Sequence, residues 1–291
     1  MTIHNPGTKV PTYSPLWTAG TKLPRDRVTM NAWARSFYAL NPDVNRIINQ
    51  HALLLTSIYE IEKGESKETN DFCKEQLEDL KFPNLIETII REYLIIGEVF
   101  LYLELNKKEN KWNNVYIQNP DYILIKKDSI NGEEAAFLRP DENLRRICVS
   151  NKPEDIETCK LLPKSVVKSV KNGENISMQP YNFWYMIYKL SPYDIRGNSF
   201  ILPLFNILRK EILSDEENQI IRSSLGDIMF FNGKGITKDV LMTRYLIIIQ
   251  QLENWFNHKL LEPVVELRNL NDKLPQVKFN KDRLRKYIEQ I

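Results

Sequence analysis

Residues 83–105 change their hydrophobic period half-way along, and this change constrains the fold more than any other feature of the chain. Pro83 can occupy the first turn of a helix, and the apolar residues after it recur at helical spacing. Gly97 stands where a helix often ends on a residue with positive φ, and strict alternation begins at Val99. A polar turn at 107–111 leads into a second strand-like run. The pattern predicts a helix, a glycine cap and an antiparallel hairpin, which is an α+β fold.

Helical and strand periods elsewhere in the chain agree with that class. Asn41 and Pro42 have the residue types of an N-cap and of a first helical position. Helices are expected at 29–62, from about residue 70, at 200–225 and at 238–261, the last limited by Pro263. Short strands are expected at 112–118, 122–125, 135–138, 146–149, 182–190 and 277–279, and a basic helix follows the last of them. The stretch 126–180 is otherwise expected to be loop-rich.

Composition limits the kinds of site that the chain can build. The 40 basic and 38 acidic residues give a net charge of +2, so no strong overall field selects a polyanion, and any DNA contact must be local or depend on an assembly. Three cysteines without C-x-x-C spacing and three histidines do not suit a zinc site, and no cofactor is expected. The chain has no signal-peptide pattern, and its apolar runs fall well short of the roughly 18 residues of a membrane span. A soluble, cytoplasmic protein is expected.

Motifs that resemble catalytic sequences each lack an essential part. The glycines before Lys234 are too far apart for a phosphate-binding loop, and the residue after it is not the required Ser or Thr. Gly197-Asn198-Ser199 lacks the second glycine of a nucleophile elbow, so Ser199 is interpreted as a helix N-cap. His51, among apolar helix positions, is interpreted as a half-buried side chain rather than a base. The sequence therefore predicts no enzymatic activity.

A run of carboxylates from Asp215 to Glu217 leaves an alternative open. Adjacent carboxylates point around a helix rather than toward one face, which favours a solvated helix surface. If Asp215 and Glu216 held a divalent ion instead, the chain would be a metal-dependent nuclease or another phosphoryl-transfer enzyme. A third alternative is a monomeric adaptor that binds another protein through its aromatic surface.

Basic residues gather in three modest clusters. They are Arg145-Arg146; Lys164, Lys168 and Lys171; and Lys281, Arg283, Arg285 and Lys286. Each could touch phosphate, because a cation there releases counterions from a nucleic acid. A solvated protein face is the favoured interpretation of all three.

The chain has, in this order, a helix start at Asn41-Pro42, a helix end at Gly97, a turn at Pro120 and a helix start at Gly197-Asn198-Ser199. In this order of segments it resembles the portal proteins of tailed bacteriophages. Gly97, Pro120, Gly197 and Ser199 are the structural-motif positions of this likeness, which spans residues 30–265. Apart from a late helix, each passage that carries it is a cap, a hairpin or a turn, which suits a protein whose task is architecture. The passages are the asparagine-proline helix start at 41–58, the helix–glycine–strand segment at 92–104, the strand and proline turn at 116–123, the loop and glycine-x-serine helix start at 193–204, and the late helix at 245–261.

The resemblance implies a portal-like fold, with helical stem and wing elements and a small antiparallel β-hairpin and sheet region. It implies a homo-oligomeric ring, commonly of about twelve subunits, at one vertex of the capsid. Double-stranded DNA would pass through the ring non-specifically during genome packaging and DNA ejection. Terminase, the major capsid protein, and the head-completion and tail proteins would dock on this head–tail connector. The chain is then expected in the virion, and in the host cytoplasm during assembly.

On this basis the chain divides into four segments: an extended N-terminal arm at 1–28, a wing-like α+β domain at 29–190, a helical stem-like region at 191–265 and a C-terminal tail at 266–291. The arm holds four prolines and is expected to wrap an adjacent subunit. Portal chains generally carry a clip and a second stem helix before the late helix. Only about 226–238 is available here, so either the clip is reduced to a short loop or part of the core is missing from this chain. Lys234 and Lys238 are the candidate cations near the DNA channel.

Overall fold

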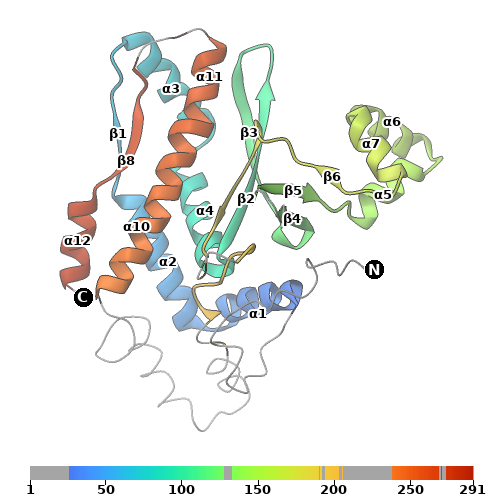
Figure 1. Ribbon diagram of the computed structural model, residues 1–291. Helices are drawn as coiled ribbons and strands as arrows, with labels where there is room; N and C mark the ends of the chain where they lie inside the picture. The colour runs from blue at the N-terminus through green and yellow to red at the C-terminus, as the bar shows by residue number, and fades with distance from the viewer. Residues whose placement is uncertain are drawn as a thin grey trace, which may run out of the picture.

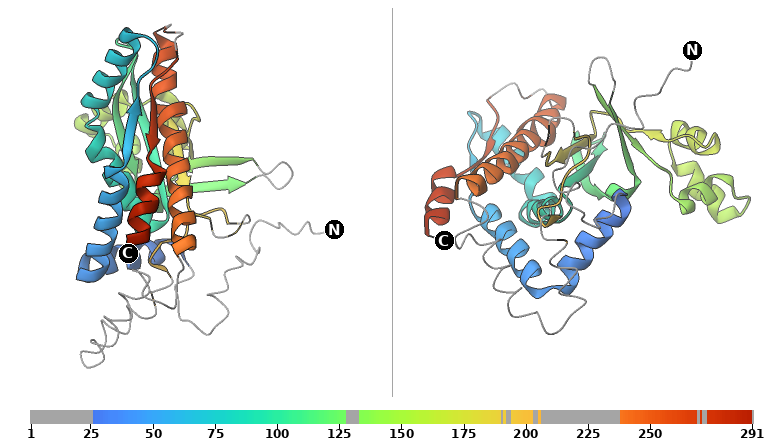
Figure 2. Two further views of the ribbon diagram at one scale, coloured as in Figure 1. Left: turned by 90° about the vertical axis from the view of Figure 1, so that its left-hand side faces the viewer. Right: turned by 60° about the horizontal axis from the view of Figure 1, so that its bottom comes forward.

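The structure, a computed structural model, describes residues 26–127, 133–189, 191, 194–202, 205, 238–268, 270 and 273–290 (Figure 1). Within these residues long helices are combined with short antiparallel strands, so the α+β class expected from the sequence is confirmed. The elements form an upright body and a small lobe that stands out from one side of it (Figures 1 and 2). The N-terminal arm up to residue 25 and most of the expected helix at 200–225 lie outside the described residues.

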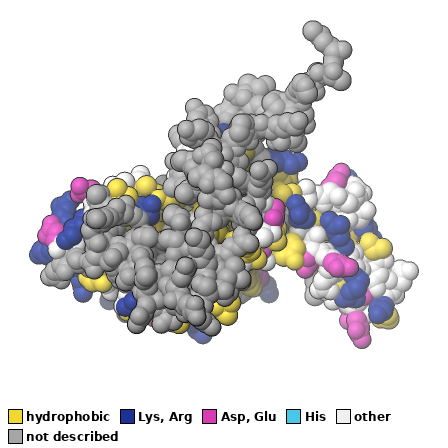
Figure 3. All heavy atoms as spheres, turned by 90° about the horizontal axis from the view of Figure 1, so that it is seen from below, with side chains coloured by type: hydrophobic (Ala, Val, Ile, Leu, Met, Phe, Trp, Pro, Cys, Tyr) yellow, Lys and Arg dark blue, Asp and Glu magenta, His cyan; other side chains and the backbone are white. Residues whose placement is uncertain are grey.

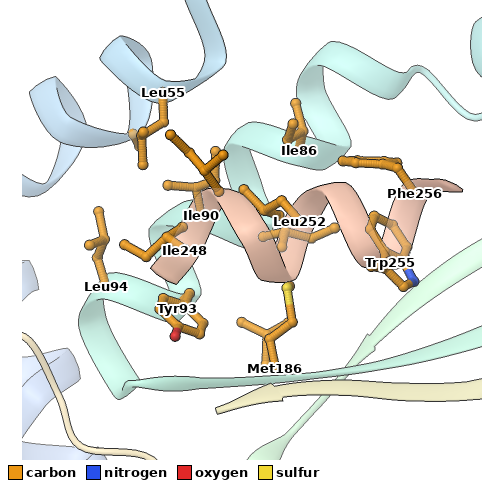
Figure 4. Packing of buried hydrophobic residues seen from close by; sticks show 14 of the residues in the cluster. Leu55, Ile86, Ile90, Tyr93, Leu94, Met186, Ile248, Leu252, Trp255 and Phe256 are labelled. Atoms are coloured by element: carbon orange, nitrogen blue, oxygen red, sulfur yellow. The ribbon is translucent and has the colours of Figure 1, made fainter. Parts of the chain in front are cut away.

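Three long helices, α2 (Pro42–Ser57), α4 (Phe82–Ile96) and α10 (Lys238–Trp255), supply much of the core. Figure 4 shows Ile90 of α4 and Leu252 of α10 turned toward the same interior, and both are at most 1% exposed. Burying an apolar side chain of this size stabilises the fold by about 2 kcal/mol. Because α10 packs into the core of the earlier helices, the 29–190 segment and the described part of the 191–265 segment share one interior.

Side chains cap the N-termini of the first two helices. Asn41 caps α2, as predicted, because its Oδ1 accepts hydrogen bonds from the backbone N–H groups of Asp43 and Val44, each at 3.0 Å. Asp26 caps the preceding helix in the same way, accepting from the N–H of Thr29 at 2.8 Å. That helix, α1 (Arg27–Leu40), therefore begins two residues before the boundary expected for the extended arm.

The described residues form three small antiparallel sheets, with the strand orders β3-β2-β7, β4-β5-β6 and β1-β8. The predicted hairpin is confirmed as β2 and β3, and β2 pairs on its other side with β7, far along the chain. The strands are β1 (Tyr59–Glu62), β2 (Glu98–Asn106), β3 (Lys111–Gln118), β4 (Ile123–Lys127), β5 (Glu134–Leu138), β6 (Ile176–Ser177), β7 (Phe183–Ile187) and β8 (Gln276–Phe279).

Trp112 joins the hairpin to helices from both ends of the chain. Its side chain is buried, and the indole N–H donates to the carbonyl of Leu260 at 2.8 Å. Its backbone N–H and C=O exchange hydrogen bonds with the side-chain amide of Gln76, at 2.8 and 3.0 Å. Gln76 lies on α3 (Lys67–Asp79), and its side-chain amide satisfies the backbone groups of Trp112 on the edge of β3, where no strand of the described residues pairs.

The C-terminal tail is tied into the body rather than lying apart from it. Strand β8 pairs with β1, residue Val277 opposite Ile61, and α12 (Lys281–Gln290) follows it along α10. The side-chain amide of Asn257 exchanges hydrogen bonds with the backbone of Val277, at 2.9 and 3.2 Å. The predicted strand at 277–279 and the basic helix after it are thus confirmed.

The strand expected at 146–149 is wrong, because these residues end α5 (Glu142–Val149). The stretch expected to be loop-rich contains two further helices, α6 (Pro153–Leu161) and α7 (Lys164–Lys171). Each runs for only eight or nine residues, too few turns for an apolar period to stand out from its surroundings. These helices form the lobe, whose own small core contains Cys148, Val170 and Ile176.

The expectation that Pro263 limits the last long helix is also wrong. A π-helical turn (Phe256–Leu261) follows α10, and Pro263 then stands in the first turn of α11 (Glu262–Leu267). The first turn of a helix leaves its N–H groups without intrahelical partners, so a proline there removes no hydrogen bond. The wider π-helical turn before Pro263 allows a new α-helical segment to begin, and the chain continues as a helix to Leu267.

His51 lies deep in the core, where it is more buried than the sequence predicted. Its Nδ1 is hydrogen-bonded to the hydroxyl of Tyr245, and burial lowers the pKa of the imidazole from 6.5 to about 4. Between these values the unfolded chain binds a proton that the folded chain does not. Neutral His51 therefore contributes its full share to the free energy of unfolding above pH 6.5. This share, about 3 kcal/mol, is lost as the pH falls toward 4.

We expect this loss to appear as a steep fall in the free energy of unfolding between pH 7 and pH 4.5, measured by urea denaturation. The variant His51→Gln cannot titrate, so its stability should fall less over the same interval. Equal falls in the two proteins would show that His51 does not govern acid stability.

Candidate functional site

Three of the four structural-motif positions, Gly97, Gly197 and Ser199, meet where α4 ends and β2 begins, which we call the α4–β2 junction. The side chain of Arg196 bonds the fourth, Pro120, to this junction. Gly97 caps α4 with φ of 85°, the cap that the sequence predicted. A Cβ atom on Gly97 would overlap the backbone of Asn198, and one on Gly197 would overlap the carbonyl of Gly97. Both positions need glycine because the two backbones touch.

The last four carbonyls of α4 are all paired, although a helix end leaves such groups without partners inside the helix. Three of the four are satisfied by residues remote in sequence, so the helix end also serves as an attachment point. The pairs are Tyr93 O with the N–H of Gly97 (2.7 Å), Leu94 O with the N–H of Phe200 (3.1 Å), Ile95 O with the hydroxyl of Ser199, and Ile96 O with the guanidinium of Arg27 (3.4 Å).

Ser199 has the capping contact expected of it together with one that the sequence did not reveal. Its Oγ accepts a hydrogen bond from the N–H of Ile201 at 3.2 Å, as a residue at a helix start does. The same hydroxyl donates to Ile95 on α4, so Ser199 fixes its loop to the helix end. The helix expected after it lies mostly outside the described residues.

A buried carboxylate lies beside the junction. Glu98 is 1% exposed, and the guanidinium of Arg196 binds both of its oxygens, with Nε 2.9 Å from Oε2. Arg27 lies 3.4 Å from Oε1, and the backbone N–H of Gly197 donates to Oε2 at 2.9 Å. Several charged and neutral donors on one carboxylate offset the water that it loses on burial.

Arg196 extends the cluster to the proline turn. Its two terminal nitrogens donate to the carbonyls of Pro120 and Ile123, each at 2.9 Å. The adjacent carboxylate of Asp121 accepts from the side chain of Asn31 on α1 at 2.6 Å. The turn, α1, the loop at 194–202 and the α4–β2 junction are therefore bonded into one unit.

The role of this ion cluster is structural. Burial lowers the pKa of the Arg27 guanidinium, and the negative charge of Glu98 opposes that shift. Both oxygens of Glu98 already accept at least two hydrogen bonds or ion pairs, so the carboxylate is committed to its protein donors. The cluster fixes backbone segments in place and leaves no group poised to react.

Sequence reasoning missed Glu98, Arg196 and Arg27. A signal existed for Glu98, since it is a single carboxylate between the apolar runs 93–96 and 99–101, and such a charge needs a cation when buried. No comparable signal showed which of the 40 basic residues would supply that cation.

The other predicted site residues lie elsewhere. Lys238 begins α10, and its ammonium donates at 3.0 Å to the carbonyl of Glu289, at the C-terminal end of α12, where a helix attracts a cation. Lys234, Asp215 and Glu216 lie outside the described residues. Across the described ranges, no three His, Cys, Asp or Glu side chains gather where they could hold a metal ion. No helix of those ranges is long and apolar enough to cross a bilayer.

No protein-family model matches the chain, and no curated protein matches it either.

Proposed function

We propose that this chain is a portal-type protein of a tailed phage, a non-enzymatic ring subunit at one capsid vertex. The ring would form the channel for DNA packaging and ejection, and a docking platform for terminase and for tail and connector proteins. Its fold would be the portal-specific form of the mixed helix and sheet architecture described above. The DNA contact would be non-specific, because a channel through which DNA slides should avoid tight contacts with bases.

The observation that carries this proposal is the α4–β2 junction. Gly97 and Gly197 stand one hundred residues apart in the sequence, yet their backbones touch, and Pro120 and Ser199 are bonded into the same unit. The positions on which the resemblance rests therefore act together, as the parts of one architectural device would. Their contacts are backbone caps and a buried ion cluster around Glu98, which suit a subunit that must stay rigid within a ring.

The mass of the protein in solution tests the proposal. We expect light scattering of the purified full chain to give a particle of about twelve times the 34.3 kDa subunit mass, and negative stain of the same peak to show rings. A chain that stays monomeric at every concentration would contradict the proposal. Magnesium-dependent DNA cleavage that Asp215→Asn and Glu216→Gln abolish would replace it with the nuclease alternative.

A further inference from the structure

The lobe contains a cavity whose lining carries charge of one sign. It has a volume of about 960 Å³ and lies among α5, α6 and α7. Lys160, Lys164, Lys168 and Lys171 line it, and none of the carboxylates that the structure describes does. Figure 3 shows the lobe from below, with basic side chains on its surface beside apolar and acidic ones. A cavity lined by four cations favours an anionic occupant.

The lysines of α7 form a stripe along the helix. Lys164, Lys168 and Lys171 occupy positions i, i+4 and i+7, which lie on one side of an α-helix over about 10 Å of its length. All are exposed, and among the described residues no carboxylate lies within ion-pairing distance of them. Their mutual repulsion within the monomer would be relieved by carboxylates supplied from outside.

Apolar side chains beside these lysines narrow the choice of occupant. Val149 and Ile156 line the same cavity and are 69% and 40% exposed. A nucleic-acid backbone offers nothing for such side chains to bury, whereas a protein surface does. The groove therefore fits an acidic protein segment better than it fits DNA.

This chain contains an acidic segment of matching dimensions. Residues 60–79 hold eight carboxylates and three lysines. On α3, Glu68, Asp71 and Glu75 stand at positions i, i+3 and i+7, which is an exposed stripe of the same length as the lysine stripe. Glu75 already pairs with Lys111 at 3.7 Å, while Glu68 and Asp71 have no ion-pair partner among the described residues.

Helix α3 and the lobe, which carry the two stripes, lie on opposite sides of the molecule. In Figure 1, α3 is at the upper left of the body and the lobe is at the right, and the right-hand view of Figure 2 keeps them apart. Complementary patches on opposite sides of one subunit produce a heterologous, head-to-tail contact, which closes into a ring when the rotation between subunits allows it.

We propose that the lysine-lined groove of the lobe binds the acidic stripe of α3 on a neighbouring copy of this chain. The inference rests on the proposed ring and adds the contact that builds it. Charge complementarity sets the register of the two helices, and Val149 and Ile156 are buried against the neighbour.

A charge swap tests this contact. Light scattering over a concentration series would compare the wild type with K164E/K168E, E68K/D71K and the four-fold combination. Each double variant should raise the concentration needed for half-assembly by about tenfold or more, and the combination should restore assembly to within about threefold of wild type. The matched control is R285E/K286E, which makes the same change of charge at two exposed cations of α12, away from both stripes in Figure 1.

The possible results distinguish a failure of the proposed contact from a failure of the proposed ring. Rings that form equally well in the wild type and in K164E/K168E would overturn the contact and leave the proposed function standing. A wild-type chain that never assembles would overturn both. If K164E/K168E assembles normally but binds a duplex DNA fragment more weakly than R285E/K286E does, the groove is a DNA site and the proposal is wrong.

Discussion

The variant Arg196→Ala should lose about 3–5 kcal/mol of its free energy of unfolding, because it leaves the Glu98 carboxylate buried without its main cation. Arg27 lies farther from Glu98, at 3.4 Å, and is itself held by carbonyls, so it cannot replace a bidentate partner. Urea denaturation at pH 7 measures the loss.

The variant Arg285→Ala is the matched control for this result. Arg285 and Asp282 form an exposed pair at 3.8 Å, so removing it should cost less than about 1 kcal/mol. In addition, E98Q/R196M should recover part of the stability lost in Arg196→Ala, because it removes the uncompensated charge together with its partner. Similar losses in Arg196→Ala and Arg285→Ala would show that the ion cluster around Glu98 does not hold the fold together.

The variant Gly197→Ala should be destabilised by more than about 3 kcal/mol, since its new Cβ would overlap the carbonyl of Gly97 and push apart two backbones. The loop at 194–202 would lift from α4 and weaken the hydrogen bonds of Leu94 and Ile95 with it. Thermal and urea denaturation measure the effect, and assembly in the same samples shows whether a loosened junction also weakens the ring.

Gly173→Ala is the control for this substitution. Gly173 has a φ of 73° but has nothing within 4 Å of an added Cβ, so alanine there costs only the left-handed backbone, about 1–2 kcal/mol. If Gly197→Ala proves no worse than Gly173→Ala, the close approach of the two backbones does not limit stability. The comparison thus separates steric overlap from backbone strain.

Local sequence determined the elements whose signals are complete within a few residues. Asn41 followed by Pro42 is enough to start a helix, because the cap and the first turn bond to each other. Gly97 between a helical period and an alternating one is enough to end α4 and begin β2. The hairpin and the strand β8 could be predicted for the same reason, since alternation and turn residues act over neighbouring positions.

Only the tertiary structure decided which remote residues meet. The sequence wrongly assigns residues 59–62 to the helix expected at 29–62, because Ile58 and Tyr59 continue its apolar spacing. They form β1 instead because the remote strand β8 pairs with them. Neither period nor spacing could assign Arg196 and Arg27 to Glu98, because a salt bridge depends on distance in space. Likewise, helices α5, α6 and α7 are too short to be stable alone, and they depend on the small apolar core that they form together in the lobe. Bonds within one turn depend on neighbouring residues alone. The lobe and its groove form only once three short helices have packed on one another, and the α4–β2 junction forms only once segments distant in the sequence have met.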